Sequence, residues 1–242
     1  MEIIYLAAVL PAVVMGLYIW KRDHGRNPLS LLMKNVLWGV VICMFVNGLE
    51  MVAGTLQMDV TAHPDSFSAL LLKSFFGNAL PEEIVKLVAL WLVLTANPYY
   101  EEHHDSIVYA ASIALGFAFA DNFFFIFNNF GLLSQWIPTA VARMLLAFPA
   151  HYFFAILMGY YYRVCQSKNH NSLDFVFVLL LPFLAHGIYD MLNVSGWLNP
   201  YVVMALSVVF FWLVTRFQHF MKKRLYARHK KVKRSMYTGL EK

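Results

Sequence analysis

The run LPEEIVKLVALWLVL, residues 80–94, places two glutamates and a lysine inside an otherwise apolar stretch. In hydrocarbon an ionised side chain costs at least about 2.5–3.5 kcal/mol. Glu82 and Lys86 are four residues apart in the favoured order, so on a helix each partly neutralises the other. Glu83 diverges by about 100° around the axis, so one glutamate can face a cavity while the other pairs with Lys86 or a neighbouring helix. Pro81 lacks a backbone N–H and can open the helix directly before them. The pattern predicts a buried charged site.

Later apolar stretches carry further polar side chains, namely Asp121, Asn122, His151, His186 and Asp190. Judged from its position within each stretch, every one of the ionisable groups Glu82, Asp121, His151 and His186 falls in one layer about two helical turns thick. An aspartate one turn from a histidine can orient it, or both can face one ion. Asn122 alone is more typical of an interhelical hydrogen bond and is expected to support the site. Glu50, in an earlier apolar stretch, has no evident place in this constellation.

A glutamate pair with two histidines and an aspartate suits the activation of water. One carboxylate can act as general base. The histidines can bind a metal that activates the water, or donate hydrogen bonds to an oxyanion. Zinc favours imidazole and carboxylate ligands with one open position. Since no Ser or Cys nucleophile accompanies the cluster, hydrolysis by activated water is the best enzymatic interpretation. A proton relay or a cation site in a transporter is the alternative, disfavoured because the two halves do not carry matching broken helices.

Composition indicates a polytopic membrane protein. Of 242 residues, 60% are hydrophobic and only 14% charged, with a mean hydropathy of +0.57, whereas soluble domains are about half apolar and about a quarter charged. Stretches that could span a bilayer occur at roughly 3–20, 32–56, 69–95, 107–127, 139–163, 175–193 and 201–217. The sequence therefore predicts an all-α bundle of about seven transmembrane helices. Residues 1–221 would form one transmembrane domain, and 222–242 a basic tail.

Basic residues give the expected orientation. Lys and Arg flank the first and fifth loops and follow the seventh stretch, whereas the loops 57–68, 128–138 and 194–200 contain neither. The positive-inside rule places the N-terminus outside and the C-terminus in the cytoplasm. The loop 96–106, predicted to be cytoplasmic, is acidic, but acidic residues contribute little to orientation. A membrane-flanking tail explains the basic run 222–234 more simply than nucleic-acid binding, so we expect contact with the lipid bilayer and no nucleic acid.

Short motifs lie in order on successive stretches: Glu82-Glu83-Ile84-Val85-Lys86, then GFAFADN with Phe117, Asp121 and Asn122, then His151 with Gly159, and finally HGIYD with His186 and Asp190. Together they resemble the PrsW family of intramembrane proteases, itself distantly similar to the CAAX prenyl-protease group, over about residues 70–195. In one departure, Asp121 stands where the family usually has Glu. Its carboxylate reaches about 1.5 Å less far, and a misplacement near 1 Å can cost about 100-fold in rate.

The resemblance implies an endopeptidase of the bacterial inner membrane that cleaves a membrane-anchored regulatory protein, such as an anti-sigma factor. In this interpretation Glu82 is the general base, Glu83 a second carboxylate, and Lys86 the cation that keeps the pair ionised. The candidate ligands of a catalytic zinc ion, or metal-free oxyanion stabilisers, are His151, His186 and Asp121, while Asp190 orients His186. The alternatives are a non-catalytic scaffold or pseudoprotease, for which the shorter Asp121 is an argument, and a proton-coupled carrier.

Overall fold

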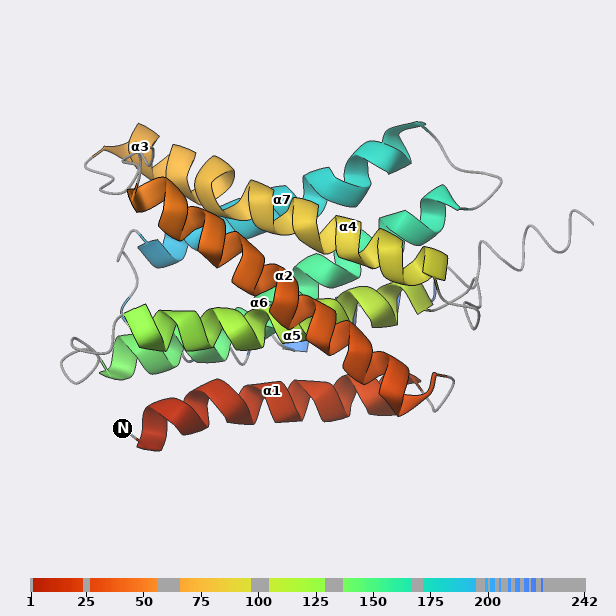
Figure 1. The fold of residues 1–242 in the computed structure, drawn as a ribbon, viewed down its shortest axis with the longest axis horizontal. Helices are drawn as coiled ribbons and strands as arrows, with labels where there is room; N and C mark the ends of the chain where they lie inside the picture. The colour runs from red at the N-terminus through yellow and green to blue at the C-terminus, as the bar shows by residue number, and fades with distance from the viewer. Residues whose placement is uncertain are drawn as a thin grey trace, which may run out of the picture.

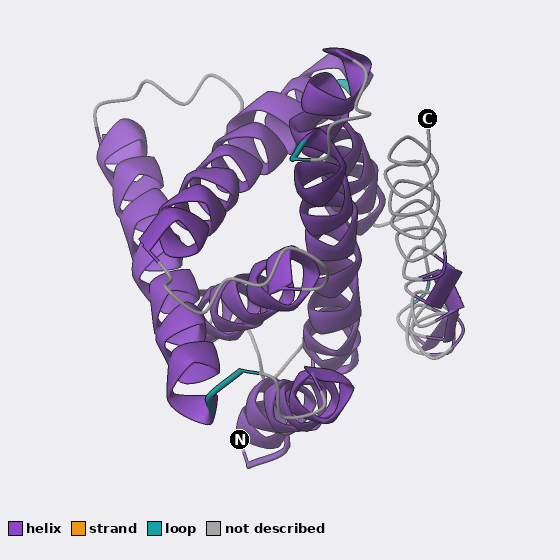
Figure 2. Ribbon diagram, turned by 90° about the vertical axis from the view of Figure 1, so that its right-hand side faces the viewer, coloured by secondary structure: helices purple, strands orange, loops and turns teal. Residues whose placement is uncertain are grey.

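The computed structural model describes residues 2–23, 27–55, 66–96, 105–128, 137–166 and 172–194, together with isolated residues beyond 198. Its elements are α1 (Glu2–Asp23), α2 (Leu29–Thr55), α3 (Phe67–Leu72), the π-helix η1 (Lys73–Ala79), α4 (Leu80–Ala96), α5 (Asp105–Asn128), α6 (Ile137–Cys165) and α7 (Ser172–Val194) (Figure 1). In this part of the chain all regular structure is helical, with no strand (Figure 2). The all-α prediction is therefore confirmed.

Six continuous helical segments make up these described ranges, because α3, η1 and α4 follow one another without a break. They correspond to the first six predicted spans. The seventh, 201–217, and the tail, 222–242, lie largely outside the described residues, so the count of seven and the orientation of the termini stay predictions. By length and composition, the helices within these segments that could cross a membrane are Leu29–Val52, Ser106–Ile126 and Ser172–Leu192.

Helix α5 is the central element of the bundle. Within the apolar windows of the three candidate spans, 72% of the window in α5 is buried, against 28% in α2 and 22% in α7. Helices α1, α2, α4 and α6 all pack against α5, and its side chains Tyr109, Ile113 and Phe117 are almost wholly buried. On α2 and α7, large apolar side chains such as Phe45 and Ile188 are exposed instead. The two outer helices thus present an apolar surface, as a protein in lipid requires.

Two glycines allow α2 and α5 to cross with their backbones in contact (Figure 1). A Cβ atom on Gly39 would overlap the carbonyl oxygen of Ile113, and one on Gly116 would overlap the carbonyl oxygen of Val36. Small residues of this kind let membrane helices approach closely. Beyond the crossing, Cys43 of α2 packs with Phe117 and Ala120 of α5, directly before Asp121.

The π-helix lies directly before Pro81, where the proline predicts an opening of the helix. The backbone N–H of Leu80 bonds to the carbonyl of Phe75, five residues back. In a regular α-helix, the ring of Pro81 would clash with the carbonyl of Gly77 and leave it without a donor. The wider π turn accommodates the proline, and such turns are frequent at functional sites.

Helix η1 also docks against α7, next to His186. The ring of Phe75 lies so close to Gly187 that a Cβ atom there would approach its Cδ1 to 2.4 Å. The same ring meets Phe183 edge-on, with centroids 5.5 Å apart. Gly187 therefore makes room for the π-helix at the level of the histidine.

We expect Gly39→Ala to destabilise the protein by about 1–3 kcal/mol, because the added methyl group overpacks a backbone contact that cannot yield. The matched control is Gly48→Ala on the same helix, where a Cβ atom meets nothing within 4 Å. Thermal unfolding in detergent, followed by circular dichroism, measures both. Equal midpoints for the two variants would contradict the close crossing of α2 and α5.

Candidate active site

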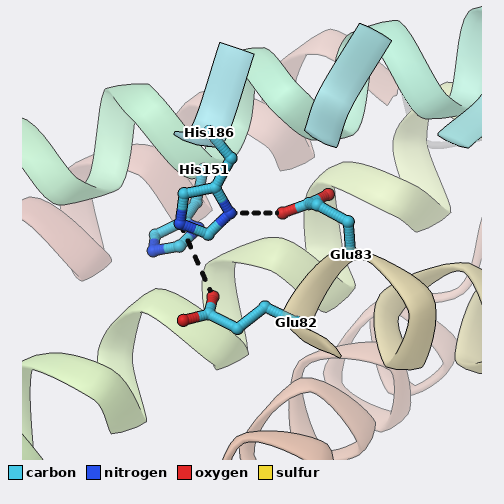
Figure 3. Close-up of side chains that lie close together, drawn as sticks. All are labelled: Glu82, Glu83, His151 and His186. Carbon is cyan, nitrogen blue, oxygen red and sulfur yellow. Dashed lines mark hydrogen bonds and ion pairs between the residues drawn. The ribbon is translucent and has the colours of Figure 1, made fainter. Parts of the chain in front are cut away.

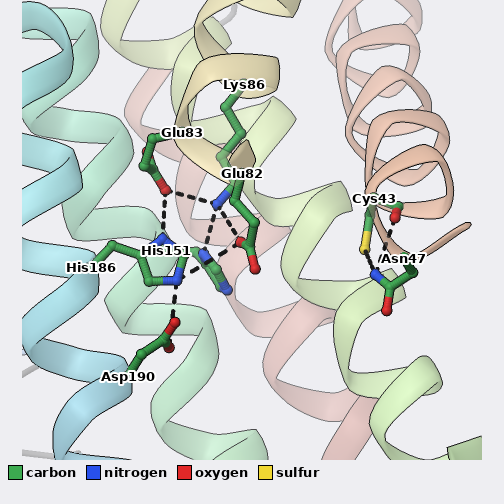
Figure 4. Close-up of polar contacts among 8 residues, drawn as sticks. All are labelled: Cys43, Asn47, Glu82, Glu83, Lys86, His151, His186 and Asp190. Atoms are coloured by element: carbon green, nitrogen blue, oxygen red, sulfur yellow. Dashed lines mark hydrogen bonds and ion pairs between the residues drawn. The ribbon is translucent and has the colours of Figure 1, made fainter. Parts of the chain in front are cut away.

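The ammonium group of Lys86 is the centre of the charged cluster. Its Nζ donates to Glu82 Oε2 at 3.0 Å and to Glu83 Oε1 at 2.9 Å (Figure 4). Nζ also lies 3.1 Å from His151 Nδ1 and 4.0 Å from the centroid of the Phe117 ring. The lysine thus pairs with both glutamates at once, and it is only 5% exposed. One cation therefore ties α4 to α5 and α6.

His186 on α7 completes the cluster through Glu83. Its Nδ1 donates to Glu83 Oε1 at 2.8 Å, while its Nε2 lies 3.8 Å from Glu82 Oε2 and 3.6 Å from Asp190 Oδ1 (Figure 4). The carboxylate at hydrogen-bond distance is therefore Glu83, and Asp190, which the sequence pattern proposes as the orienting group, lies farther away. A carboxylate on Nδ1 fixes the tautomer and leaves Nε2 for a ligand or substrate.

Phe154 holds the two imidazole rings in place. It stacks on His186 with centroids 4.8 Å apart and an interplanar angle of 20°, and it meets His151 edge-on at 5.8 Å. The imidazoles are themselves nearly perpendicular, 5.1 Å apart. The sequence motifs do not include Phe154. The available signal is its position three residues after His151, which puts both side chains on one face of α6.

A polar cavity of about 200 Å³ opens beside this cluster. Its lining consists of Asn47, Glu50, Asn78, Glu82, Asp121, Phe124, Phe125, His151, His186, Tyr189 and Asp190. Five predicted site residues thus meet at one cavity, Asp121 among them, and Glu50 joins them from α2. Glu83 and Lys86 lie behind the lining, with Glu83 fully buried. Asn122 is buried outside the lining, and its supporting role stays a prediction.

Within the described residues, Glu82, Glu83, His151 and His186 offer ligand atoms that all lie within 4.8 Å of one another (Figure 3). The predicted ligand set was His151, His186 and Asp121. The structure adds both glutamates to the histidines, while Asp121 lines the cavity beside them. The site thus offers two imidazoles and several carboxylates, a donor set that suits zinc.

Two further features fit a divalent cation. Glu83 Oε2 is buried and has no hydrogen-bond partner in the described part of the chain. Five carboxylates stand on or beside the cavity, Glu50, Glu82, Glu83, Asp121 and Asp190, and Lys86 is the cation bonded to the cluster. An excess of negative charge inside a membrane protein must be balanced by a bound cation or by protons. The residues present therefore fit a metal ion.

Comparison with known proteins assigns the arrangement to a family. Residues 27–215 match the model of the PrsW family of intramembrane metalloproteases. This chain belongs to the PrsW family. The match extends beyond the four motifs at both ends and takes in α2, whose side chains form part of the cavity wall. PrsW membership supports protease function and makes the chain an integral membrane protein.

Curated PrsW proteins resemble the chain over most of its length. The protease PrsW of Oceanobacillus iheyensis is 27% identical over 214 residues, which are 88% of this chain and 92% of that protein. The protease PrsW of Clostridioides difficile is 29% identical over 87% of both chains, and that of Geobacillus kaustophilus is 28% identical over 87% of this chain and 88% of its own. No solved structure matches the chain.

We expect Lys86→Met to lower the free energy of unfolding by about 3–5 kcal/mol, because it leaves the buried Glu83 carboxylate without its cation. The double variant Glu83→Gln/Lys86→Met removes both charges and should regain part of this loss. Lys34→Met, at an exposed lysine of α2, is the control. Unfolding in mixed micelles measures all three. A Lys86→Met protein as stable as the control would contradict a structural role for this ion pair.

Proposed function

We propose that the protein is an endopeptidase of the bacterial inner membrane that cleaves a membrane-anchored regulatory protein, of the anti-sigma-factor kind, with water as nucleophile. The observation that carries the proposal is that Glu82, His151 and His186, from three different helices, line one polar cavity in a bundle of a protease family. The proposal includes seven spans, an outer N-terminus, a transmembrane domain over 1–221 and a cytoplasmic tail over 222–242.

In this mechanism Glu82 is the general base. Its carboxylate lines the cavity and takes a proton from the attacking water as the oxygen of the water bonds to the scissile carbonyl carbon. When the carbon–nitrogen bond breaks, Glu82 returns that proton to the leaving amine. Lys86, 3.0 Å from Glu82 Oε2, stabilises the ionised carboxylate before the attack.

The histidines stabilise the oxygen of the tetrahedral intermediate. Glu83 binds the Nδ1–H of His186 at 2.8 Å, so that Nε2 faces the cavity side of the ring, where Asp190 lies 3.6 Å away. His186 Nε2 donates to this oxygen when the ring is an imidazolium, with a proton on each nitrogen, and the donor is then preorganised, because the Glu83 contact and the Phe154 ring already fix the ring. In place of that donor, a zinc ion held by the neutral rings of His151 and His186 with Asp121 would supply a Lewis acid for the same oxygen and for the water, and Glu82 would remain the base.

The position of Asp121 supports catalysis over a pseudoprotease. Asp121 has a shorter side chain than the glutamate usual at this place, yet it lies in the lining of the same cavity as Glu82 and His186. Because α2 crosses α5 closely at Gly39 and Gly116, the helix that carries Asp121 is held against its neighbour. The close packing offers the shorter aspartate a fixed position at the cavity.

We expect Glu82→Gln and His186→Ala each to lower cleavage by about 100-fold or more, since each removes a group needed for proton transfer or charge stabilisation. Quantitative sequencing of new N-termini in membranes that contain wild-type or variant protein measures this. Thr95→Ala is the control, because this exposed residue of α4 bonds, within the described part of the chain, only to carbonyls of its own helix. Identical N-termini from wild type and both variants would reject the assigned roles and favour a scaffold.

We expect close to one zinc ion per chain in the purified wild-type protein and almost none in the His151→Ala/His186→Ala variant, because two imidazole ligands are lost. Inductively coupled plasma mass spectrometry on protein purified without chelator gives the ratio. Thr95→Ala protein, prepared in parallel, controls for metal picked up during purification. Wild type and double variant with the same metal content would contradict a zinc site built on these histidines.

A further inference from the structure

The cavity lining includes two neutral amides that the mechanism above does not use. Asn47 comes from α2 and Asn78 from η1, and both line the same cavity as Glu82. Figure 4 shows Asn47 standing across from the cluster of Glu82, Lys86 and the histidines. The cavity therefore offers neutral hydrogen-bonding groups as well as charged ones.

The side chain of Asn47 is fixed by its own helix. Its Nδ2 donates to the carbonyl oxygen of Cys43 at 3.1 Å and lies 3.4 Å from Cys43 Sγ. With the amide nitrogen turned back to α2, the Oδ1 atom is the end that remains for a ligand. Asn47 thus offers the cavity a hydrogen-bond acceptor in a defined position.

Asn78 stands one turn before Glu82, four residues earlier, so it lies above the general base on the same side of the helical segment. It belongs to the π-helix that Pro81 imposes. Among the described residues its side chain has no hydrogen-bond partner, so its amide offers both a donor and an acceptor. The π-helix therefore places the Asn78 amide, which has no partner among the described residues, near Glu82.

A membrane-spanning substrate creates a need for such groups. A peptide bond inside a regular helix has its N–H and C=O engaged, so the segment around the scissile bond must unwind before water can attack. Each backbone group released in this way costs several kcal/mol in a water-poor setting unless it finds a new partner. Side-chain amides provide the donors and acceptors that an unwound backbone requires.

We propose that Asn47 and Asn78 bind the unwound backbone of the substrate beside the scissile bond. Asn47 Oδ1 accepts a backbone N–H, and the Asn78 amide pairs with a peptide group next to the carbonyl that faces Glu82. This inference rests on the proposed protease function and adds substrate-binding residues to it. Because the contacts are to backbone, the two asparagines recognise an extended conformation and not a particular side chain.

The first test separates binding from chemistry. The probe is a synthetic peptide that contains the cleavage sequence found from the new N-termini, reconstituted with the enzyme in vesicles of phosphatidylethanolamine and phosphatidylglycerol. Asn47→Ala and Asn78→Ala should each lower kcat/KM by about 10-fold through KM, the effect of one lost buried hydrogen bond. Asn35→Ala, an asparagine of the same helix α2 that does not line the cavity, is the matched control. In the inactive Glu82→Gln background, the cavity variants should weaken binding of the same peptide equally.

The second test changes the substrate and leaves the enzyme intact, so it does not depend on the folding of a variant. Single ester linkages replace backbone amides at positions around the scissile bond, and each removes one N–H. At one position the ester should lower kcat/KM of the wild type by about 10-fold but leave that of Asn47→Ala unchanged, because the acceptor is already absent.

The outcomes distinguish this inference from the proposed function. If the wild type cleaves the peptide but both asparagine variants match Asn35→Ala in KM and in binding, the backbone site is wrong and the protease stands. Equal effects of every ester on wild type and Asn47→Ala would reject the role of Asn47 in the same way. If Glu82→Gln cleaves as well as the wild type, the protease mechanism itself fails, and this inference fails with it.

Discussion

The ion pair between Lys86 and the two glutamates is the interaction on which the rest of the site depends. The free-energy cost of burying these charges in a membrane interior is offset only if every charge has a partner at close range. Lys86 therefore contacts Glu82 and Glu83 on its own helix, and His151 and the Phe117 ring on two others. Glu83 also accepts a hydrogen bond from His186, which extends the network to α7. A single buried cation thus fixes the mutual positions of four helices at the level where the chemistry is proposed.

The sequence was sufficient for the local part of this network. The spacing of Glu82 and Lys86 predicts their contact, because residues four apart on a helix are always neighbours. The common depth of Glu82, His151 and His186 was also predictable, since the length of each apolar stretch fixes the height of its residues. The spacing of four residues, by contrast, did not identify the closest partner of His186. Asp190 is one turn away, but Glu83, more than 100 residues distant in sequence, makes the shorter contact.

What sequence could not supply was the rotation of each helix about its axis. Gly39 and Gly116 permit a close crossing only because they meet each other's helices, and nothing in either local sequence identifies the partner. The same holds for Gly187, because the ring of Phe75 occupies the space that a side chain would need there. These contacts turn α2 and η1 so that Asn47, Glu50 and Asn78 reach the cavity. Pro81 was the exception, because its effect on its own helix is local and therefore predictable.

The presence of neutral amides among the charged groups of the cavity matches the different needs of the proposed catalysis and of a substrate backbone. Proton transfer needs ionisable groups, and of these Glu82, Glu83 and His151 contact Lys86. The substrate backbone carries no net charge, so a charged partner would have to be desolvated without an opposite charge to compensate it. Neutral amides avoid that penalty, and a cavity of about 200 Å³ has room for waters that satisfy them when no substrate is bound. Waters in this cavity would also lie beside Glu82, so the groups proposed to receive the substrate would keep water within reach of the proposed base.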